Sequence, residues 1–360
     1  MYAQAQQGLM TTYREAWRTR GALAWMVSAG LMSFYLVLYF TTWLDAFSEG
    51  VGLHDKWFLY SVVYCFAMIG GGVYFLRRHG NSRYQRLRTY VNVSVQVLLG
   101  FCVPFFMKLA GGKDYYFQYF WPLKIDYLFP GTLHSLPIYL LLYAMLGSLV
   151  AVPLVTYFFG KRWYCSWVCG CGALANTFGD PWRHLSSKST KAWRFENVSI
   201  YTVLVVAVAT TAIVAGNQFL GGGHGAFTRF ANEVQHYYFL VVASILAGVV
   251  GTGLYPVLGT RVWCRYFCPM AALLGLISKL GRFRIAVKKD MCISCGNCST
   301  YCEMGIDVRS YAQSNESFTR ASCVGCGICA HVCPRGVLKL ENGWRLSSDK
   351  KRQHLPIVDF

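Results

Sequence analysis

Six long apolar stretches dominate this 360-residue sequence and constrain its fold more than any other feature. They cover residues 22–43, 57–76, 91–110, 136–159, 198–216 and 237–258. Each has about 19 to 24 residues, which is enough to cross the hydrocarbon core of a bilayer as a helix. One such stretch could be a buried core helix, but six in succession with polar loops between them predict six membrane spans. The first is too long for a signal peptide, and no small-residue cleavage site follows it.

Basic residues alternate between the loops that join these stretches. Fourteen Lys and Arg lie before residue 21, between residues 77 and 88, and between residues 161 and 194, whereas the alternate loops hold five. Because cytoplasmic loops carry the excess of Lys and Arg, we expect a multi-pass protein of the inner (cytoplasmic) membrane with both termini in the cytoplasm. The net charge of +18 is then a property of topology, and we expect no nucleic-acid partner.

The fifteen cysteines are concentrated in a few places. Thirteen form tight groups, and only Cys65 and Cys102 stand alone, both inside apolar stretches, where we interpret them as packing residues. Because the cytoplasm keeps thiols reduced, we expect metal or cluster ligands in the tight groups and not disulfides.

After the sixth stretch the composition becomes mixed, and residues 281–345 contain two short strand-like runs, Arg282–Val287 and Gly336–Leu340. Two runs of the form C-x2-C-x2-C-x3-C lie between them, formed by Cys292, Cys295, Cys298 and Cys302 and by Cys323, Cys326, Cys329 and Cys333. This is the spacing of bacterial ferredoxins with two [4Fe–4S] clusters, in which the fourth cysteine of each run ligates the other cluster. Two zinc sites are the alternative, but zinc frameworks usually show separated C-x2-C pairs.

The spacing predicts crossed ligand sets. We expect one cluster on Cys292, Cys295, Cys298 and Cys333, and the other on Cys323, Cys326, Cys329 and Cys302. Glycines allow the tight turns between ligands, and we expect the fourth cysteine of each run on a short helical turn. Cys302 is followed by Glu303 where such runs commonly have Pro, which removes no ligand. From residue 282 onward the net charge is +5, and two clusters of roughly two negative charges each would nearly balance it.

A second cysteine motif is repeated within the apolar part. The segments K-R-W-Y-C-S-W-V-C-G-C-G-A-L, from residue 161, and T-R-V-W-C-R-Y-F-C-P-M-A-A-L, from residue 260, each follow an apolar stretch and place C-x3-C after an Arg and an aromatic residue. This spacing would put both thiols on the same side of one helical turn. Cys165, Cys169, Cys264 and Cys268 would then form a third cluster site at the membrane surface, with Cys171 as an extra thiol. Reduced thiols that pack helix ends are the alternative.

Taken together, these motifs resemble the NosR/NapH-type membrane polyferredoxins over roughly residues 90–345. That resemblance implies electron transfer between the quinone pool, cytoplasmic clusters and periplasmic redox proteins, with a flavoprotein or cytochrome c as partner. NosR-type members also carry a periplasmic FMN domain, which we do not find here, so FMN would be borne by a partner. The family has Pro after the second cysteine of each pair, whereas Cys169 is followed by Gly170.

The sequence therefore predicts an α-helical polytopic domain of six transmembrane helices over residues 1–280, a small α+β two-cluster ferredoxin domain over residues 281–345, and a short tail over residues 346–360. The leading hypothesis is an electron-transfer subunit of a membrane oxidoreductase complex without catalytic residues of its own. A copper-reducing assembly factor similar to the CcoG-type membrane ferredoxins and a redox sensor are alternatives. The former usually has an additional carboxy-terminal β-domain, and the latter needs an output domain. The aromatic segment Tyr115–Pro130 is either an interfacial belt or part of a quinone or partner site.

Overall fold

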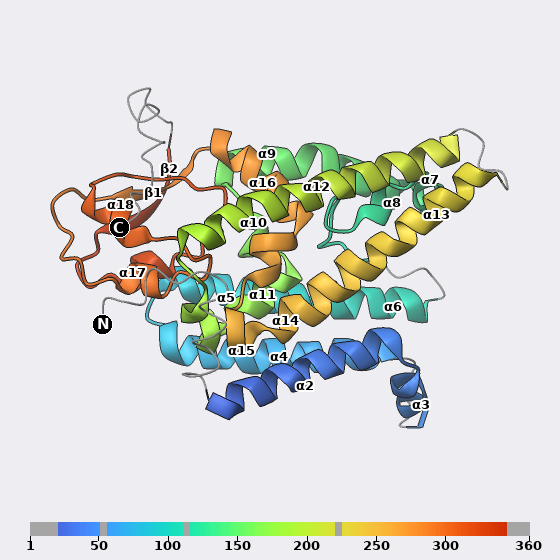
Figure 1. Cartoon of the computed structure of the whole chain (residues 1–360), viewed down its shortest axis with the longest axis horizontal. Helices are drawn as coiled ribbons and strands as arrows, with labels where there is room; N and C mark the ends of the chain where they lie inside the picture. The colour runs from blue at the N-terminus through green and yellow to red at the C-terminus, as the bar shows by residue number, and fades with distance from the viewer. Residues whose placement is uncertain (1–20, 51–55, 111–114, 220–224, 344–360) are drawn as a thin grey trace.

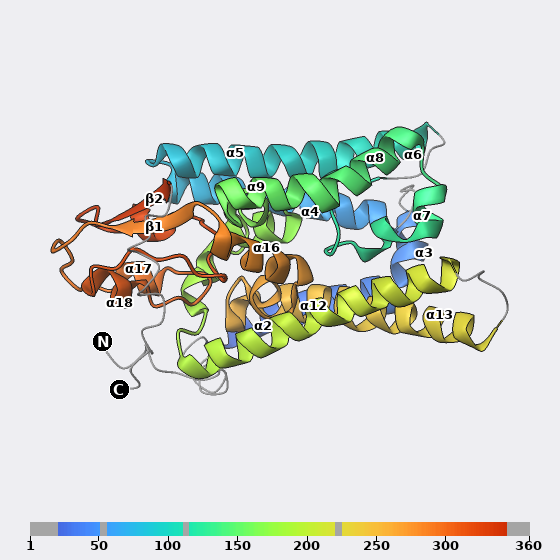
Figure 2. The same cartoon turned by 90° about the horizontal axis from the view of Figure 1, so that it is seen from above.

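The computed structural model describes residues 21–50, 56–110, 115–219 and 225–343. Long helices lie side by side along the longest axis of the molecule, and a small module containing β1, β2 and α17 to α19 sits beyond one end of them (Figures 1 and 2). We call that end of the helices the module end.

Six helices in the described residues are long and apolar enough to cross a membrane: Ala22–Phe40, Lys56–His79, Arg83–Leu109, Ile138–Phe159, Thr190–Phe219 and Ala226–Gly253. Each predicted apolar stretch coincides with one of them, so the prediction of six long apolar helices is confirmed. The limits of three differ clearly, and one of them is the fifth helix, which begins at Thr190, before the predicted residue 198. The third helix begins at Arg83, before the predicted residue 91, and the sixth begins at Ala226 and ends at Gly253. Residues 254–258, assigned to the sixth stretch, instead turn into the separate short helix α15 (Tyr255–Leu258).

Several of these helices contain a π-helical segment in which the backbone is wound more loosely. Three of the six long helices are single segments: α2 (Gly21–Phe40), α4 (Lys56–His79) and α12 (Thr190–Phe219). Each of the other three consists of an α-helical, a π-helical and a second α-helical segment. The third helix is α5 (Arg83–Val97), η2 (Leu98–Cys102) and α6 (Val103–Leu109), the fourth is α8 (Ile138–Leu146), η4 (Gly147–Ala151) and α9 (Val152–Phe159), and the sixth is α13 (Ala226–Tyr238), η6 (Phe239–Val250) and α14 (Gly251–Gly253). Shorter elements join them: α3 (Trp43–Gly50), η3 (Ile125–Leu128), α7 (Pro130–His134), α10 (Arg162–Cys165), α11 (Gly170–Asn176), η5 (Asp180–Leu185), α15, η7 (Trp263–Phe267) and α16 (Pro269–Leu280).

One face of α5 is polar and buried. Its members recur every three or four residues, which places them on one side of a helix; they are Gln85, Arg88, Thr89, Asn92 and Gln96. Polar residues at these positions lower the hydropathy of the first turns, which explains why the predicted stretch began too late.

The aromatic segment 115–130 packs against itself and against α8. Tyr115 and Tyr127 stack with ring centroids 4.7 Å apart, and Tyr143 meets Tyr115 edge-on at 6.3 Å. Trp121 donates its indole N–H to Thr211 of α12 at 3.0 Å. This packing suits an aromatic belt, and a quinone site there stays a prediction.

The module is built on a two-stranded sheet. Strands β1 (Phe283–Val287) and β2 (Leu338–Asn342) pair antiparallel, with Phe283 opposite Asn342. The first strand was predicted to within one residue, and the second begins two residues later than predicted. Three helical segments lie between the strands: α17 (Asn297–Thr300), α18 (Val308–Gln313) and α19 (Ile328–His331). A continuous core of buried residues joins the module to the helices.

Candidate iron–sulfur sites

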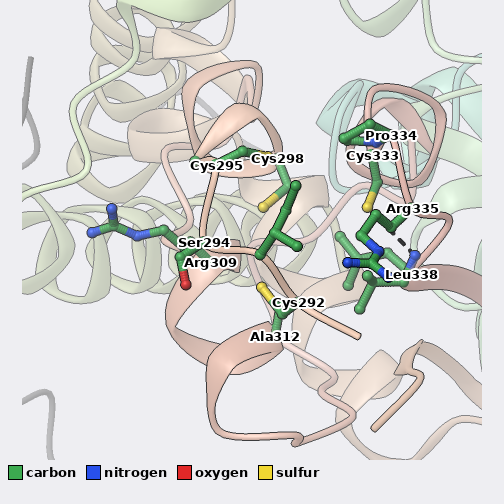
Figure 3. A pocket seen from close by; sticks show the side chains of 13 residues that line it. Cys292, Ser294, Cys295, Cys298, Arg309, Ala312, Cys333, Pro334, Arg335 and Leu338 are labelled. Atoms are coloured by element: carbon green, nitrogen blue, oxygen red, sulfur yellow. Dashed lines mark hydrogen bonds between the residues drawn. The ribbon is translucent and has the colours of Figure 1, made fainter. Parts of the chain in front are cut away.

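A cavity in the module, here called the outer cavity, collects cysteines from both runs. Cys292, Cys295 and Cys298 of the first run line it together with Cys333 of the second. Figure 3 shows the sulfur atoms of Cys292, Cys298 and Cys333 turned toward the same space. These four residues are the set predicted for one cluster.

A second cavity, here called the inner cavity, collects the other set. It is lined by Cys323, Cys326 and Cys329 of the second run and by Cys302 of the first. The structure thus brings together both crossed sets of four cysteines, while their ligation of a cluster stays a prediction. Within the described residues, no three His, Cys, Asp or Glu side chains are close enough to share a single metal ion. Thiolates bound to the different irons of a [4Fe–4S] cube stand farther apart than the ligands of one zinc, whose Zn–S bonds are about 2.3 Å.

Glycine in the left-handed conformation begins the helical turn of each cysteine run. Gly296 has φ 81° before α17, and Gly327 has φ 75° before α19, a region that favours glycine. Cys298 and Cys329, the third cysteines, lie inside these turns. The prediction that the fourth cysteines occupy the helical turns was therefore wrong, because Cys302 and Cys333 follow the turns, where the chain has already left the helix.

Backbone N–H groups point at several of the sulfurs, as iron–sulfur sites require. Ile306 donates to Sγ of Cys302 and Val337 to Sγ of Cys333, each at 3.4 Å, and Gly325 donates to Sγ of Cys323 at the same distance. Such hydrogen bonds stabilise negative charge on thiolate sulfur and are among the groups that set a cluster's potential. The donor set of both cavities fits [4Fe–4S] clusters.

The loop of the inner cavity is hydrogen-bonded to the module end of α5. The Tyr84 hydroxyl donates to the Gly325 carbonyl at 2.8 Å. Gln85 Nε2 and Arg88 Nη1 both donate to the Cys326 carbonyl at 3.0 Å. The inner cavity therefore faces the long helices.

The polar face of α5 continues to the first half of the cysteine repeat. Asn92 Nδ2 donates to the Ser166 carbonyl at 2.9 Å, and Gln96 Nε2 donates to the Val168 carbonyl at 2.6 Å. The Ser166 hydroxyl in turn donates to the Val324 carbonyl of the module at 2.6 Å. One helix face thus fixes the loop of the inner cavity and the loop that carries Cys165 relative to each other.

The four repeated cysteines, here called the repeat cysteines, are all buried, with 4–5% of each residue exposed: Cys165, Cys169, Cys264 and Cys268. All four lie in one core. The prediction that each pair shares one helical turn was wrong. Cys165 ends α10 and Cys264 lies in η7, whereas Cys169 and Cys268 have extended backbone and precede α11 and α16. The chain changes direction between the thiols because a new helix starts after the second one.

The side chain of Arg261 connects the two halves of the repeat. Its Nη1 donates to the Cys165 carbonyl at 3.3 Å and to Sγ of Cys264 at 3.8 Å. Burial raises the pKa of the Cys165 thiol to about 12. A hydrogen bond from Cys171 lowers the pKa of the Cys169 thiol to about 7, against the effect of burial. The region therefore holds a permanent cation beside thiols of unequal acidity.

A buried ionic network that sequence analysis missed joins the repeat cysteines to the module. The Glu303 carboxylate accepts from Arg261 Nη2 at 2.9 Å and from Arg183 Nη1 at 2.8 Å, and all three side chains are at most 1% exposed. Burial alone would raise the pKa of Glu303, but the two guanidinium groups hold it below its usual value. The signal in the sequence was Glu in place of Pro after Cys302.

Two buried arginines beside the cysteine sites keep donors without a partner among the described residues. These are Nε and Nη2 of Arg88 and Nε of Arg261. A buried N–H without an acceptor costs about 1–3 kcal/mol, and more when the group is charged. An anionic cluster near these groups would supply compensating charge, which fits the cysteine donor sets.

The departure from Pro at position 170 has a steric reason. A Cβ atom on Gly170 would lie 2.8 Å from the Tyr119 hydroxyl and 2.9 Å from Gln96 Oε1. The Tyr64 hydroxyl also donates to the Gly170 carbonyl at 3.0 Å. Pro269 occupies the equivalent first position of α16, which suits proline.

Comparisons with known proteins match these sites. A family described as a 4Fe-4S dicluster domain matches residues 285–340, which contain both cavities. A family described as a 4Fe-4S binding domain matches residues 141–190 and again residues 241–288, and each match contains one half of the cysteine repeat.

The chain is also similar to whole proteins of related description. It is 25% identical over 170 residues to YccM of Escherichia coli (strain K12), named as an electron transport protein, covering 42% of this chain and 44% of YccM. It is 24% identical over 183 residues to the methylamine utilization ferredoxin-type protein MauN of Methylobacillus flagellatus, covering 50% of this chain and 59% of MauN. The chain thus spans about half the length of these curated relatives. No solved structure matches it significantly. The findings support an iron–sulfur electron-transport protein of the membrane type.

Proposed function

We propose that this chain is a membrane-bound electron-transfer subunit. It relays electrons between [4Fe–4S] clusters on the cytoplasmic side and a membrane quinone or a periplasmic redox partner such as a flavoprotein or cytochrome. The proposal rests on three groups of cysteines that lie in succession within one continuous core: those of the outer cavity, those of the inner cavity and the repeat cysteines.

Direct contacts support the last step of this order. Ser166, next to Cys165, donates to the carbonyl of Val324, next to Cys323. Arg261 contacts Sγ of Cys264 and also Glu303, which follows Cys302. A bound cluster supplies a one-electron centre whose potential depends on its surroundings. The residues of this chain fix the separation of the sites, exclude water from the repeat cysteines and place a cation beside them.

We further propose that the repeat cysteines hold a third [4Fe–4S] cluster. Four buried sulfurs, one buried guanidinium and the 4Fe-4S family matches around both halves of the repeat support it. The proposal includes the topology predicted from the basic loops, with both termini cytoplasmic, and the NosR/NapH-type resemblance. Any FMN would belong to a partner subunit.

The test is electron transfer across reconstituted vesicles. The anaerobically purified protein, with the partner that co-purifies with it, is reduced from the module side, and an acceptor on the opposite side is followed optically. The double variant Cys264→Ser and Cys268→Ser should abolish this transfer while the module clusters still reduce normally. Cys65→Ser with Cys102→Ser is the matched control, because these half-buried cysteines lie outside the proposed sites. Unchanged transfer in the first variant would rule out the relay through the repeat cysteines.

A further inference from the structure

The lining of the outer cavity includes exposed residues, whereas none of the residues that line the inner cavity is exposed. Cys295 at its edge is exposed, and its neighbour Ile293 is an apolar side chain with 53% exposure. Pro334, which also lines this cavity, is exposed as well. An apolar centre beside an accessible redox site is the usual form of a transient docking surface.

Basic residues lie on the chain segments that adjoin this cavity. Those with exposed side chains are Lys288, Lys289, Arg335 and Lys339, here called the basic rim. None of the four forms an ion pair with another residue that the structure describes. The acidic residue next to them, Asp290, is held by Asn315, whose Nδ2 donates to Asp290 Oδ1 at 2.8 Å.

Backbone contacts place the rim at the cavity. Arg335 lines the outer cavity directly, as does Val337, whose carbonyl accepts from the Lys288 N–H at 2.9 Å. Lys339 follows on β2, opposite Ala286. Of the rim's positive charges, that of Arg335 therefore lines the cavity that contains Cys295, and the lysines of the rim lie on the segments directly beside it.

The position of the module argues against a lipid surface as the occupant. In both views the module, with α17 and α18, lies beyond the ends of the long helices along the longest axis of the molecule (Figures 1 and 2). If those helices span a membrane, this end projects away from the bilayer. A soluble partner reaches it, whereas the headgroups around the helices do not.

We propose that the basic rim docks an acidic, soluble one-electron carrier protein, which exchanges electrons with the cluster held by the cysteines of the outer cavity. The inference rests on the proposed function and adds the class of its cytoplasmic partner. In the exchange a single electron passes between the reduced carrier and the oxidised centre of the module, and no bond is formed or broken. Charge complementarity of this kind raises association rates by about 10- to 1000-fold and weakens as salt screens it.

The test measures the rate at which a reduced acidic [2Fe–2S] ferredoxin, used as probe, reduces the full-length protein in stopped flow. At low salt the double variant Lys289→Glu and Arg335→Glu should react at least about tenfold more slowly, and its rate should lose most of its salt dependence. The control Lys191→Glu with Arg194→Glu makes the same change of charge at exposed positions on α12 and should react as the wild type does.

The docking surface and the electron relay can fail independently in these experiments. Equal rates in wild type and rim variant would overturn the docking surface, even if dithionite-driven transfer across vesicles is intact. A slower rim variant upholds it, even if no electron reaches the opposite side. If the rim variant lost binding to anionic phospholipid vesicles but kept its rate with the ferredoxin, the rim would be a lipid surface and the proposal would fall.

Discussion

The substitution Glu303→Gln tests whether buried charge holds the module on the helices. The carboxylate is fully buried and faces two guanidinium groups at 2.8 and 2.9 Å, those of Arg183 and Arg261. The Glu303 main-chain carbonyl also accepts from the Ser186 hydroxyl at 2.6 Å, which the variant keeps. Glutamine preserves the shape but removes the carboxylate that pairs with Arg261, and it leaves Arg183 with Asp180 at 3.0 Å as its remaining buried counter-charge.

The cost should be large because water cannot compensate at this site. Removing one partner of a buried ion pair costs about 3–5 kcal/mol. At about 1.4 kcal/mol per tenfold change, the population with the module detached should rise by roughly two to three and a half powers of ten. Amide hydrogen exchange measures this opening directly, because exchange of protected amides tracks the free energy of local opening. The informative peptides cover the loop of the inner cavity, around Cys326.

Glu341→Gln is the matched control within the same module. Glu341 pairs with Arg284 at 3.5 Å, but both side chains are partly exposed, so its loss should cost no more than about 1 kcal/mol. If Glu303→Gln accelerates exchange in the inner loop no more than Glu341→Gln does, the buried carboxylate does not hold the module on the helices.

Three further predictions follow from the topology and the cysteine sites. A carboxy-terminal alkaline phosphatase fusion should be inactive, because both termini are predicted to be cytoplasmic; strong activity would contradict that topology. Cys302→Ser should damage the cluster of the inner cavity, and an electron paramagnetic resonance spectrum that instead lost only the outer cluster would show that the ligand sets are not crossed. Iron analysis of the anaerobic protein should give about twelve atoms per chain with a third cluster and about eight without it. A Cys165→Ser, Cys264→Ser variant that kept all its iron would eliminate the third cluster.

The long helices were predictable because each is a continuous apolar segment of about twenty residues, which hydropathy detects without knowledge of distant contacts. The residues at which they begin and end were not predictable in this way. The third helix begins with Arg83, and Arg88 is buried on it. From sequence alone these residues read as a polar loop. Only the carbonyls of another segment, such as that of Cys326, explain why a helix there keeps polar groups inside. This partner of Arg88 is 238 residues away and cannot be found by a hydropathy window.

Among the cysteine sites, too, the features that depend on local sequence were predictable, and those that depend on distant contacts were not. The two sets of the module follow from spacing within single runs, and the structure places each set around one cavity. The repeat cysteines were grouped by an internal repeat, but their backbone was not foreseen, because the helix start after Cys169 and Cys268 depends on Gly170 and Pro269. The burial of Glu303 could not be predicted either, since it depends on arginines 42 and 120 residues away.

The asymmetry of the repeat gives each half a different attachment. In the first half, carbonyls accept hydrogen bonds from α4 and α5, so a small residue is required where Tyr64 and Gln96 approach Gly170. In the second half, Arg261 turns inward to Glu303, whereas Arg162, its counterpart in the repeat, lies over the ring of Phe283 at 4.7 Å. The first half is therefore bound to α4 and α5 by neutral hydrogen bonds, whereas the arginine of the second half forms a buried ion pair with Glu303. The contacts of Tyr64, Gln96 and Tyr119 at Gly170 are the steric reason why this copy has glycine where the other has Pro269.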